Sequence, residues 1–145
     1  MFKLIIFDLD GTLIDTKRDI ADACNYALAQ CGFPLRDLDE YNMLVGRGID
    51  NLFRSALPEG KANDDTVKAM RGHFVPYYNE HKCDYTRPYE GIVKVLETLS
   101  QKGMQFAVAS NKYQEGTEQL VEKFFGSFNF IKILGQREGK PIKPD

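Results

Sequence analysis

The sequence predicts an α/β protein with a Rossmann-like parallel sheet as its core and a helical cap insertion. Two short apolar runs, at 4–7 and 106–109, and a mainly apolar segment at 130–134 have the length of strands, and helical patterns lie between them. An order of strand, helix, strand, helix, strand is typical of right-handed crossovers in a parallel sheet. The segment from 16 to 87 shows helical patterns only, which predicts a separate helical domain within the chain.

The first strand is the apolar run Leu4-Ile5-Ile6-Phe7. Four consecutive residues of the buried type predict a strand that is covered on both faces, as in a parallel sheet. Asp15 or Thr16 can cap the helix that follows, and Gly32 is expected to end it. The apolar residues of this helix recur every three or four positions: Ile20, Ala23, Cys24, Ala27, Leu28 and Cys31.

Three more helices are expected before the next strand. The first covers about 38–45, the second runs from about 49 to 57, and the third follows a cap at Asn63 or Asp64 and reaches about 79. Four helices in a row differ from the flanking pattern. We therefore predict a cap domain over 16–87, inserted into an α/β core formed by 1–15 and 88–145.

The α/β pattern resumes after a hinge expected at 87–91, where Pro88 and Gly91 punctuate the chain. A helix ending at Gly103 is predicted next, with one apolar face, and a strand at 106–110 follows it. A helix around Leu120 and a strand at 130–134 complete the pattern. The apolar face of the first of these helices comprises Ile92, Val93, Leu96 and Leu99.

Charge and composition narrow the possible partners. The formal net charge of −2 over 145 residues lacks the excess of positive charge that is typical of nucleic-acid-binding proteins. No stretch approaches the roughly 18 apolar residues that a membrane span needs. The first strand begins at the fourth residue, which leaves no room for a signal peptide, so a cytoplasmic location with three reduced cysteines is expected.

Two carboxylates, Asp8 and Asp10, stand where the first strand ends and the Gly11 loop begins. In open α/β sheets, ligands bind outside the carboxyl ends of the strands. Like charges two residues apart repel each other, and a bivalent cation with oxygen ligands would remove that repulsion. The alternative is an ordinary acidic turn, because Asp and Gly are favoured turn residues.

The run Asp8-x-Asp10-Gly11-Thr12-Leu13, followed by Asp15, resembles the first motif of the haloacid dehalogenase superfamily of phosphohydrolases. Ser110-Asn111 after the second apolar run resembles the second motif, and Lys143-Pro144-Asp145 resembles the start of the third. The spacing resembles the phosphoglycolate phosphatase-like branch. The family's fourth motif, a Gly-Asp pair with a further Asp, is not found. We therefore expect the 145 residues to be part of a longer two-domain protein, with the first strand as an exposed edge.

The resemblance implies a magnesium-dependent hydrolysis of a small phosphorylated metabolite. It implies Asp8 as the nucleophile that forms an aspartyl-phosphate, and Asp10 as the acid and base; both would also hold Mg²⁺. Lys143 would supply a fixed positive charge, with Lys140 as the rival candidate. The phosphate-binding residues implied are Gly11, Thr12, Ser110 and Asn111.

Substrate selection is expected from the cap, where Gly46 and Gly48 flank Arg47. The glycines let the backbone bend sharply, so that the Arg47 guanidinium can reach a carboxylate or phosphate, as in 2-phosphoglycolate; the alternative is an exposed arginine at a helix end. Two other functions stay open. One is a phosphomutase of the β-phosphoglucomutase type, and the other is a catalytically incomplete fragment that binds phosphate or a partner. The sequence does not indicate an oligomeric state.

Overall fold

The computed structural model describes residues 3–144, which divide by their contacts into two compact units. The α/β unit comprises the chain up to Asp15 and again from Arg87, and the helical unit comprises Thr16–Thr86. That the helical unit acts as a cap stays a prediction.

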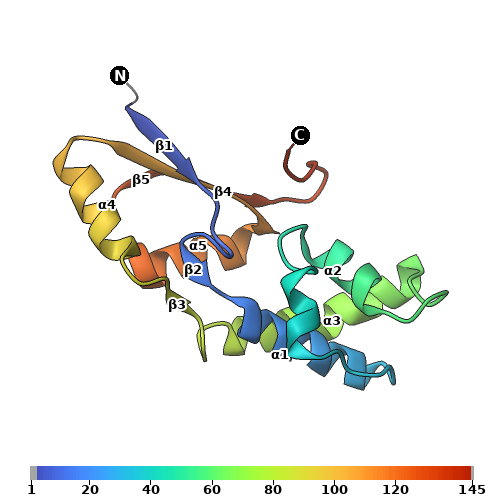
Figure 1. The fold of residues 1–145 in the computed structure, drawn as a ribbon. Helices are drawn as coiled ribbons and strands as arrows, with labels where there is room; N and C mark the ends of the chain where they lie inside the picture. Colours follow the sequence, from blue (N-terminus) through green and yellow to red (C-terminus); the bar gives the residue numbers. More distant parts are fainter. Residues whose placement is uncertain (1–2, 145) are drawn as a thin grey trace. The chain divides into compact units, whose positions relative to one another are not determined.

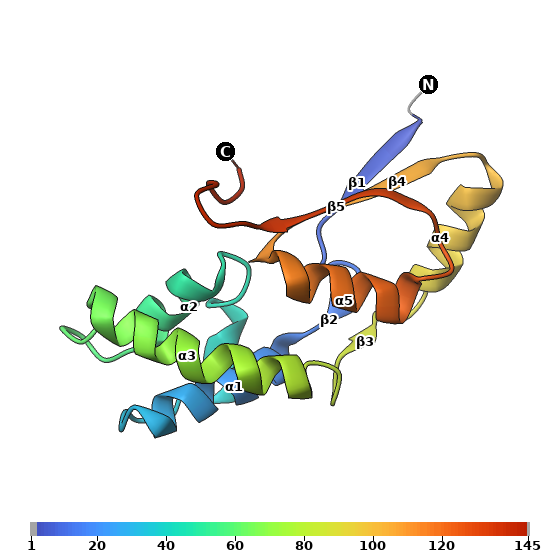
Figure 2. The same ribbon diagram turned by 180° about the vertical axis from the view of Figure 1, so that it is seen from behind.

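The α/β unit contains a sheet of three parallel strands in the order β1-β4-β5 (Figure 1). These are β1 (Leu4–Phe7), β4 (Gln105–Tyr113) and β5 (Phe130–Gln136). The helix α4 (Ile92–Gln101) leads into β4, and α5 (Gln114–Phe125) connects β4 to β5. Figure 2 shows α5 beside β5, against which it packs. The predicted α/β fold with a parallel sheet is confirmed.

The prediction that the first strand is covered on both faces is wrong. Leu4 is 40% exposed and Ile6 is 63% exposed. The physical reason is that no described helix packs extensively against β1, whose main neighbour is β4, paired from Leu4 opposite Gln105 to Phe7 opposite Val108. Within residues 3–144 no other strand pairs with β1. The exposed edge is therefore as expected.

A second, short sheet was not predicted. The strands β2 (Ile14–Asp15) and β3 (Arg87–Pro88) pair antiparallel, with Ile14 opposite Pro88. The amide of Tyr89 also donates to the carbonyl of Leu13 at 3.2 Å. The expected hinge at 87–91 thus begins with a strand.

The helical unit consists of α1 (Lys17–Gln30), the 3₁₀ helix η1 (Leu38–Asn42), α2 (Ile49–Ala56) and α3 (Asp64–His81). The four helices were predicted, although the second is a 3₁₀ helix and shorter than expected. Helix α3 packs against α1 and α2, and η1 contacts α1. The core of this unit is rich in fully buried aromatic side chains: Tyr41, Phe53, Phe74 and Tyr78. None of the helices in residues 3–144 combines the length and the apolar composition that crossing a membrane requires.

Candidate active site

The loop after β1 carries Asp8 and Asp10. Leu9 and Leu13 are fully buried and anchor the loop. The carbonyl of Leu9 accepts the amides of Thr12, Leu13 and Ile14 at 3.0–3.2 Å. This tight turn needs a positive φ at Gly11, which is +80° there. The two aspartates flank the buried Leu9, and the Asp8 side chain is exposed whereas the Asp10 side chain is largely buried.

Asp8 and Lys143 form an ion pair that is open to solvent. Lys143 Nζ lies 3.1 Å from Asp8 Oδ1, and the two side chains are 39% and 45% exposed, respectively. The same ammonium donates to the carbonyl of Ala109 at 2.7 Å, and the amide of Leu9 donates to Asp8 Oδ1. Among residues 3–144 no hydrogen bond or ion pair involves Asp8 Oδ2. One oxygen of this carboxylate is therefore held by two partners, and the side chain stays 45% exposed.

Asp10 has a different partner, Lys112, which sequence reasoning missed. Lys112 Nζ lies 3.2 Å from Asp10 Oδ1, and the side chains are only 4% and 9% exposed. The strand β4 continues to Tyr113, so Ser110 and Lys112 fall on one face of it. The predicted strand ended at residue 110, so Lys112 was not recognised as lying on the same face as Ser110. Period-two alternation through Phe106, Val108 and Ser110 was the signal that pointed to Lys112.

Ser110 and Asn111 organise the backbone around the two ion pairs. Ser110 Oγ accepts the amide of Lys112 at 3.1 Å, and Asn111 Oδ1 accepts the amide of Lys143 at 2.6 Å. The hydroxyl of Ser110 and the amide NH₂ of Asn111 are hydrogen-bond donors of the kind that phosphate oxygens accept. Their predicted role in phosphate binding stays a prediction.

The structure brings most of the predicted site residues together in the α/β unit. Asp8, Asp10, Gly11 and Thr12 lie on the loop after β1, whereas Ser110, Asn111 and Lys143 approach from β4 and from the segment after β5. Lys143, not the rival Lys140, contacts Asp8.

Arg47 belongs to the helical unit. It is exposed in the loop between η1 and α2, and its carbonyl accepts a hydrogen bond from Asn51 Nδ2 at 2.8 Å. The flanking Gly46 and Gly48 have φ values of +116° and +86°. The sharp bends expected on both sides of Arg47 are therefore present.

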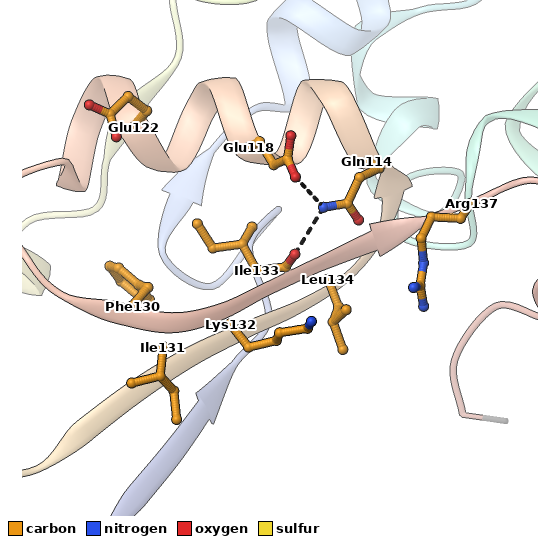
Figure 3. A pocket seen from close by; sticks show the side chains of 9 residues that line it. All are labelled: Gln114, Glu118, Glu122, Phe130, Ile131, Lys132, Ile133, Leu134 and Arg137. Carbon is orange, nitrogen blue, oxygen red and sulfur yellow. Dashed lines mark hydrogen bonds between the residues drawn. The ribbon is translucent and has the colours of Figure 1, made fainter.

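A surface pocket of about 600 Å³ lies elsewhere in the α/β unit, between α5 and β5 (Figure 3). Gln114 Nε2 bridges the carboxylate of Glu118 and the carbonyl of Ile133 across it, at 2.7 and 2.9 Å. The pocket contains none of the predicted site residues.

Comparison with known proteins places these features in a family. Residues 5–145 match the family model described as haloacid dehalogenase-like hydrolase. The phosphoglycolate phosphatase of Pasteurella multocida is 36% identical over 149 residues, which cover 99% of this chain and 66% of that protein. That of Aquifex aeolicus is 35% identical and matches 92% of this chain and 60% of its own length.

A solved structure of a similar protein has the same fold. The crystal structure of a predicted phosphoglycolate phosphatase from Haemophilus somnus has a TM-score of 0.85 at 29% identity, covering 99% of this chain and 66% of that one. The chain thus spans just under two thirds of the length of these curated relatives and of this structure.

Proposed function

The chain belongs to the haloacid dehalogenase-like hydrolases, and on that premise we propose that it carries the phosphoryl-transfer site of a magnesium-dependent phosphatase acting on a small phosphomonoester such as 2-phosphoglycolate. One observation carries the proposal. A solvent-accessible carboxylate, Asp8, stands at the carboxyl end of a parallel strand with a lysine ammonium 3.1 Å from one of its oxygens. A nucleophile and a positive charge are thereby available at one point for an anionic substrate.

In the first step, Asp8 Oδ2 attacks the phosphorus atom and the ester P–O bond breaks. The phosphoryl group passes to Asp8 as an aspartyl-phosphate, and the alkoxide takes a proton from Asp10. In the second step, water attacks the phosphorus of this intermediate and gives its proton to Asp10, which releases phosphate and restores Asp8. Asp10 is two residues from Asp8 on the same loop, which suits it for both proton transfers.

Phosphoryl transfer depends mainly on positioning and on stabilisation of charge. Lys143 supplies a fixed positive charge beside Asp8. Backbone and side-chain donors of Gly11, Thr12, Ser110 and Asn111 are proposed to bind the phosphoryl oxygens. Arg47 is proposed to select the acidic end of the substrate.

The donors of the loop fit part of a magnesium site. Magnesium is usually bound by one or two carboxylates, with water and phosphate oxygens at its other positions. The exposed Asp8 carboxylate and the main-chain carbonyl of Asp10 are suitable ligands of this kind. Within residues 3–144 no group of three or more His, Cys, Asp or Glu side chains could hold a metal ion. When bound, magnesium would reduce the repulsion between the carboxylate nucleophile and the substrate.

The test is phosphate release from 2-phosphoglycolate with and without Mg²⁺ by the 145-residue chain, beside Asp8→Asn and a control, Asp37→Asn, in the helical unit. We expect release by the parent and the control, and none above background by Asp8→Asn. Equal release by the Asp8→Asn variant would refute the nucleophile. No release by a folded parent chain would instead favour a fragment that only binds phosphate.

Arg47 is tested separately by Arg47→Ala. We expect the KM for 2-phosphoglycolate to rise far more than the KM for an uncharged aryl phosphate, because only the former offers a second anionic group. An equal change for both substrates would remove Arg47 from the proposed binding site.

A further inference from the structure

Lys112 forms an ion pair with Asp10 but takes no part in the reaction scheme proposed above. We propose that Lys112 is a positioning residue, which holds the Asp10 carboxylate where it exchanges a proton with the leaving group and with water. This inference rests on the proposed function. It starts from the 3.2 Å contact between Lys112 Nζ and Asp10 Oδ1.

Burial distinguishes this pair from the other ion pair of the site. The Lys112 and Asp10 side chains are 4% and 9% exposed, whereas those of Lys143 and Asp8 are 39% and 45% exposed. A lysine has a long flexible stem and ordinarily keeps its ammonium in water. Burying that charge is costly unless an opposite charge compensates it. Each buried charge therefore restrains the other, and Asp10 has little freedom to turn away.

The backbone that carries Lys112 is fixed from several sides. Its amide donates to Ser110 Oγ at 3.1 Å, and its carbonyl accepts from Thr117 Oγ1 at 3.1 Å. Thr117 is fully buried at the start of α5. On β5, a Cβ at Gly135 would stand 2.7 Å from the same carbonyl, so the neighbouring strand approaches closely. A rigid support of this kind is what holding a reactive group in place requires.

A general acid matters most when the leaving group is a poor one. An alkoxide such as that of 2-phosphoglycolate needs a proton as the P–O bond breaks, whereas p-nitrophenolate leaves readily without one. A misplaced Asp10 should therefore slow the hydrolysis of alkyl phosphates more than that of p-nitrophenyl phosphate. A general loss of structure would slow the hydrolysis of both substrates by the same factor.

The kinetic test compares Lys112→Met with a control, Lys123→Met, which removes an exposed lysine from α5. We expect kcat/KM for 2-phosphoglycolate to fall at least about ten-fold more than kcat/KM for p-nitrophenyl phosphate in Lys112→Met, and neither to change in Lys123→Met. Equal falls for the two substrates would overturn the positioning role. Absence of activity in the parent chain would count against the proposed function and not against Lys112.

A stability cycle decides whether Lys112 holds Asp10, without any need for activity. The urea midpoints of Lys112→Met, Asp10→Asn and the double variant are compared with the parent. We expect the double variant to lose less than the sum of the two single losses, because neither charge is then buried alone. Additive losses would overturn the proposal. If Lys112→Met does not fold, a double variant that folds supports the pairing, and one that does not fold overturns it.

Discussion

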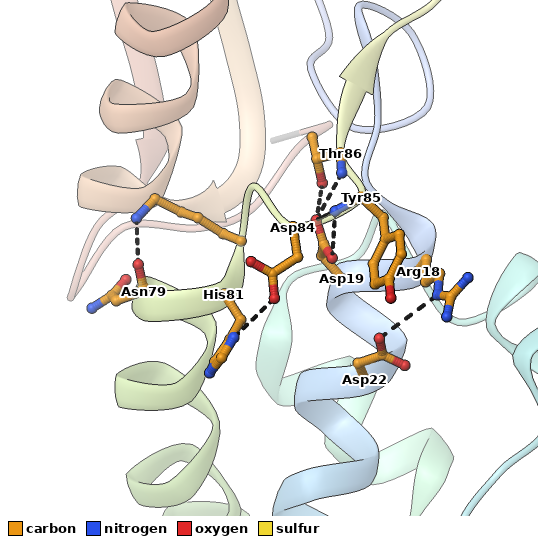
Figure 4. A network of polar contacts seen from close by, with 9 residues as sticks. Arg18, Asp19, Asp22, Asn79, His81, Asp84, Tyr85 and Thr86 are labelled. Atoms are coloured by element: carbon orange, nitrogen blue, oxygen red, sulfur yellow. Dashed lines mark hydrogen bonds and ion pairs between the residues drawn. The ribbon is translucent and has the colours of Figure 1, made fainter.

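Replacement of Asp19 by alanine should destabilise the helical unit strongly. Asp19 lies in the first turn of α1 and is 3% exposed. Its Oδ2 accepts the amide of Thr86 at 2.8 Å and the hydroxyl of Thr86 at 2.6 Å. The amide of Tyr85 donates to both carboxylate oxygens at 3.0–3.1 Å (Figure 4). One carboxylate thus connects the beginning of the unit to its end, 67 residues later.

The size of the effect follows from burial. Hydrogen bonds to a charged group contribute about 1.5–3 kcal/mol each, and buried donors that lose their acceptor bear a desolvation cost. Two of the three donors belong to Thr86, which is 1% exposed. The third, the amide of Tyr85, is only partly buried and contributes less. We expect Asp19→Ala to lower the free energy of unfolding by about 3–5 kcal/mol.

The assay is urea unfolding followed by circular dichroism, with Asp22→Ala as the matched control. Asp22 lies on the same helix and pairs with Arg18 at 3.9 Å, but the side chains of Arg18 and Asp22 are 54% and 47% exposed. A surface pair of this kind contributes less than about 1 kcal/mol. If Asp19→Ala stayed within about 1 kcal/mol of the parent, the reasoning from buried acceptors would be refuted.

Three further predictions concern local features. Asn63 caps α3 by accepting the amide of Thr66 at 2.8 Å, so Asn63→Ala should lower the free energy of unfolding by about 1 kcal/mol in the same urea assay. Gly135→Ala should lower it by about 1–3 kcal/mol, because the added Cβ would meet the carbonyl of Lys112 at 2.7 Å. Burial raises the pKa of Cys24 from 9.0 to about 11, with a hydrogen bond to Tyr41 opposing the shift. A raised pKa means that the unfolded thiol ionises first, so stability should fall by about 2–3 kcal/mol as the pH rises from 9 to 11.

For each of these three predictions, one experimental result would contradict it. An Asn63→Ser variant should keep most of the cap, so equal losses from Asn63→Ala and Asn63→Ser would argue against capping. Unchanged stability in Gly135→Ala would mean that β5 can shift away from β4. The alkaline loss of stability should be smaller in Cys24→Ala, and equal slopes in that variant and in the parent would assign the loss to other groups.

Local patterns in the sequence determined most of the elements. The apolar runs predicted the three strands of the sheet, and the helical period predicted α1, α2, α3, α4 and α5 within a few residues. The turn at Gly11 and the position of Asp8 and Asp10 beyond β1 were also predictable, because a strand end, two acidic residues and a glycine are adjacent in the chain. Such features depend on neighbours within a few positions, and the sequence shows those neighbours directly.

The exposure of the side chains of β1 and the length of β4 depended on tertiary structure. Leu4 and Ile6 are as apolar as core residues, yet they are exposed because no helix within residues 3–144 packs extensively against β1. Periodicity reports which side chains share a face, but it does not report what covers that face.

The partner of Asp10 was decided by tertiary structure alone, whereas the family resemblance had already implied Lys143 as the positive charge of the site. Asp10 pairs with Lys112, Asp8 with Lys143 and Asp19 with the backbone at Thr86, and each of these contacts joins residues more than 60 positions apart. Any of the chain's lysines could have paired with either carboxylate as far as composition shows. Strand register and burial selected the partner, because an ion pair forms only where the fold brings two charges together and compensates the loss of their hydration.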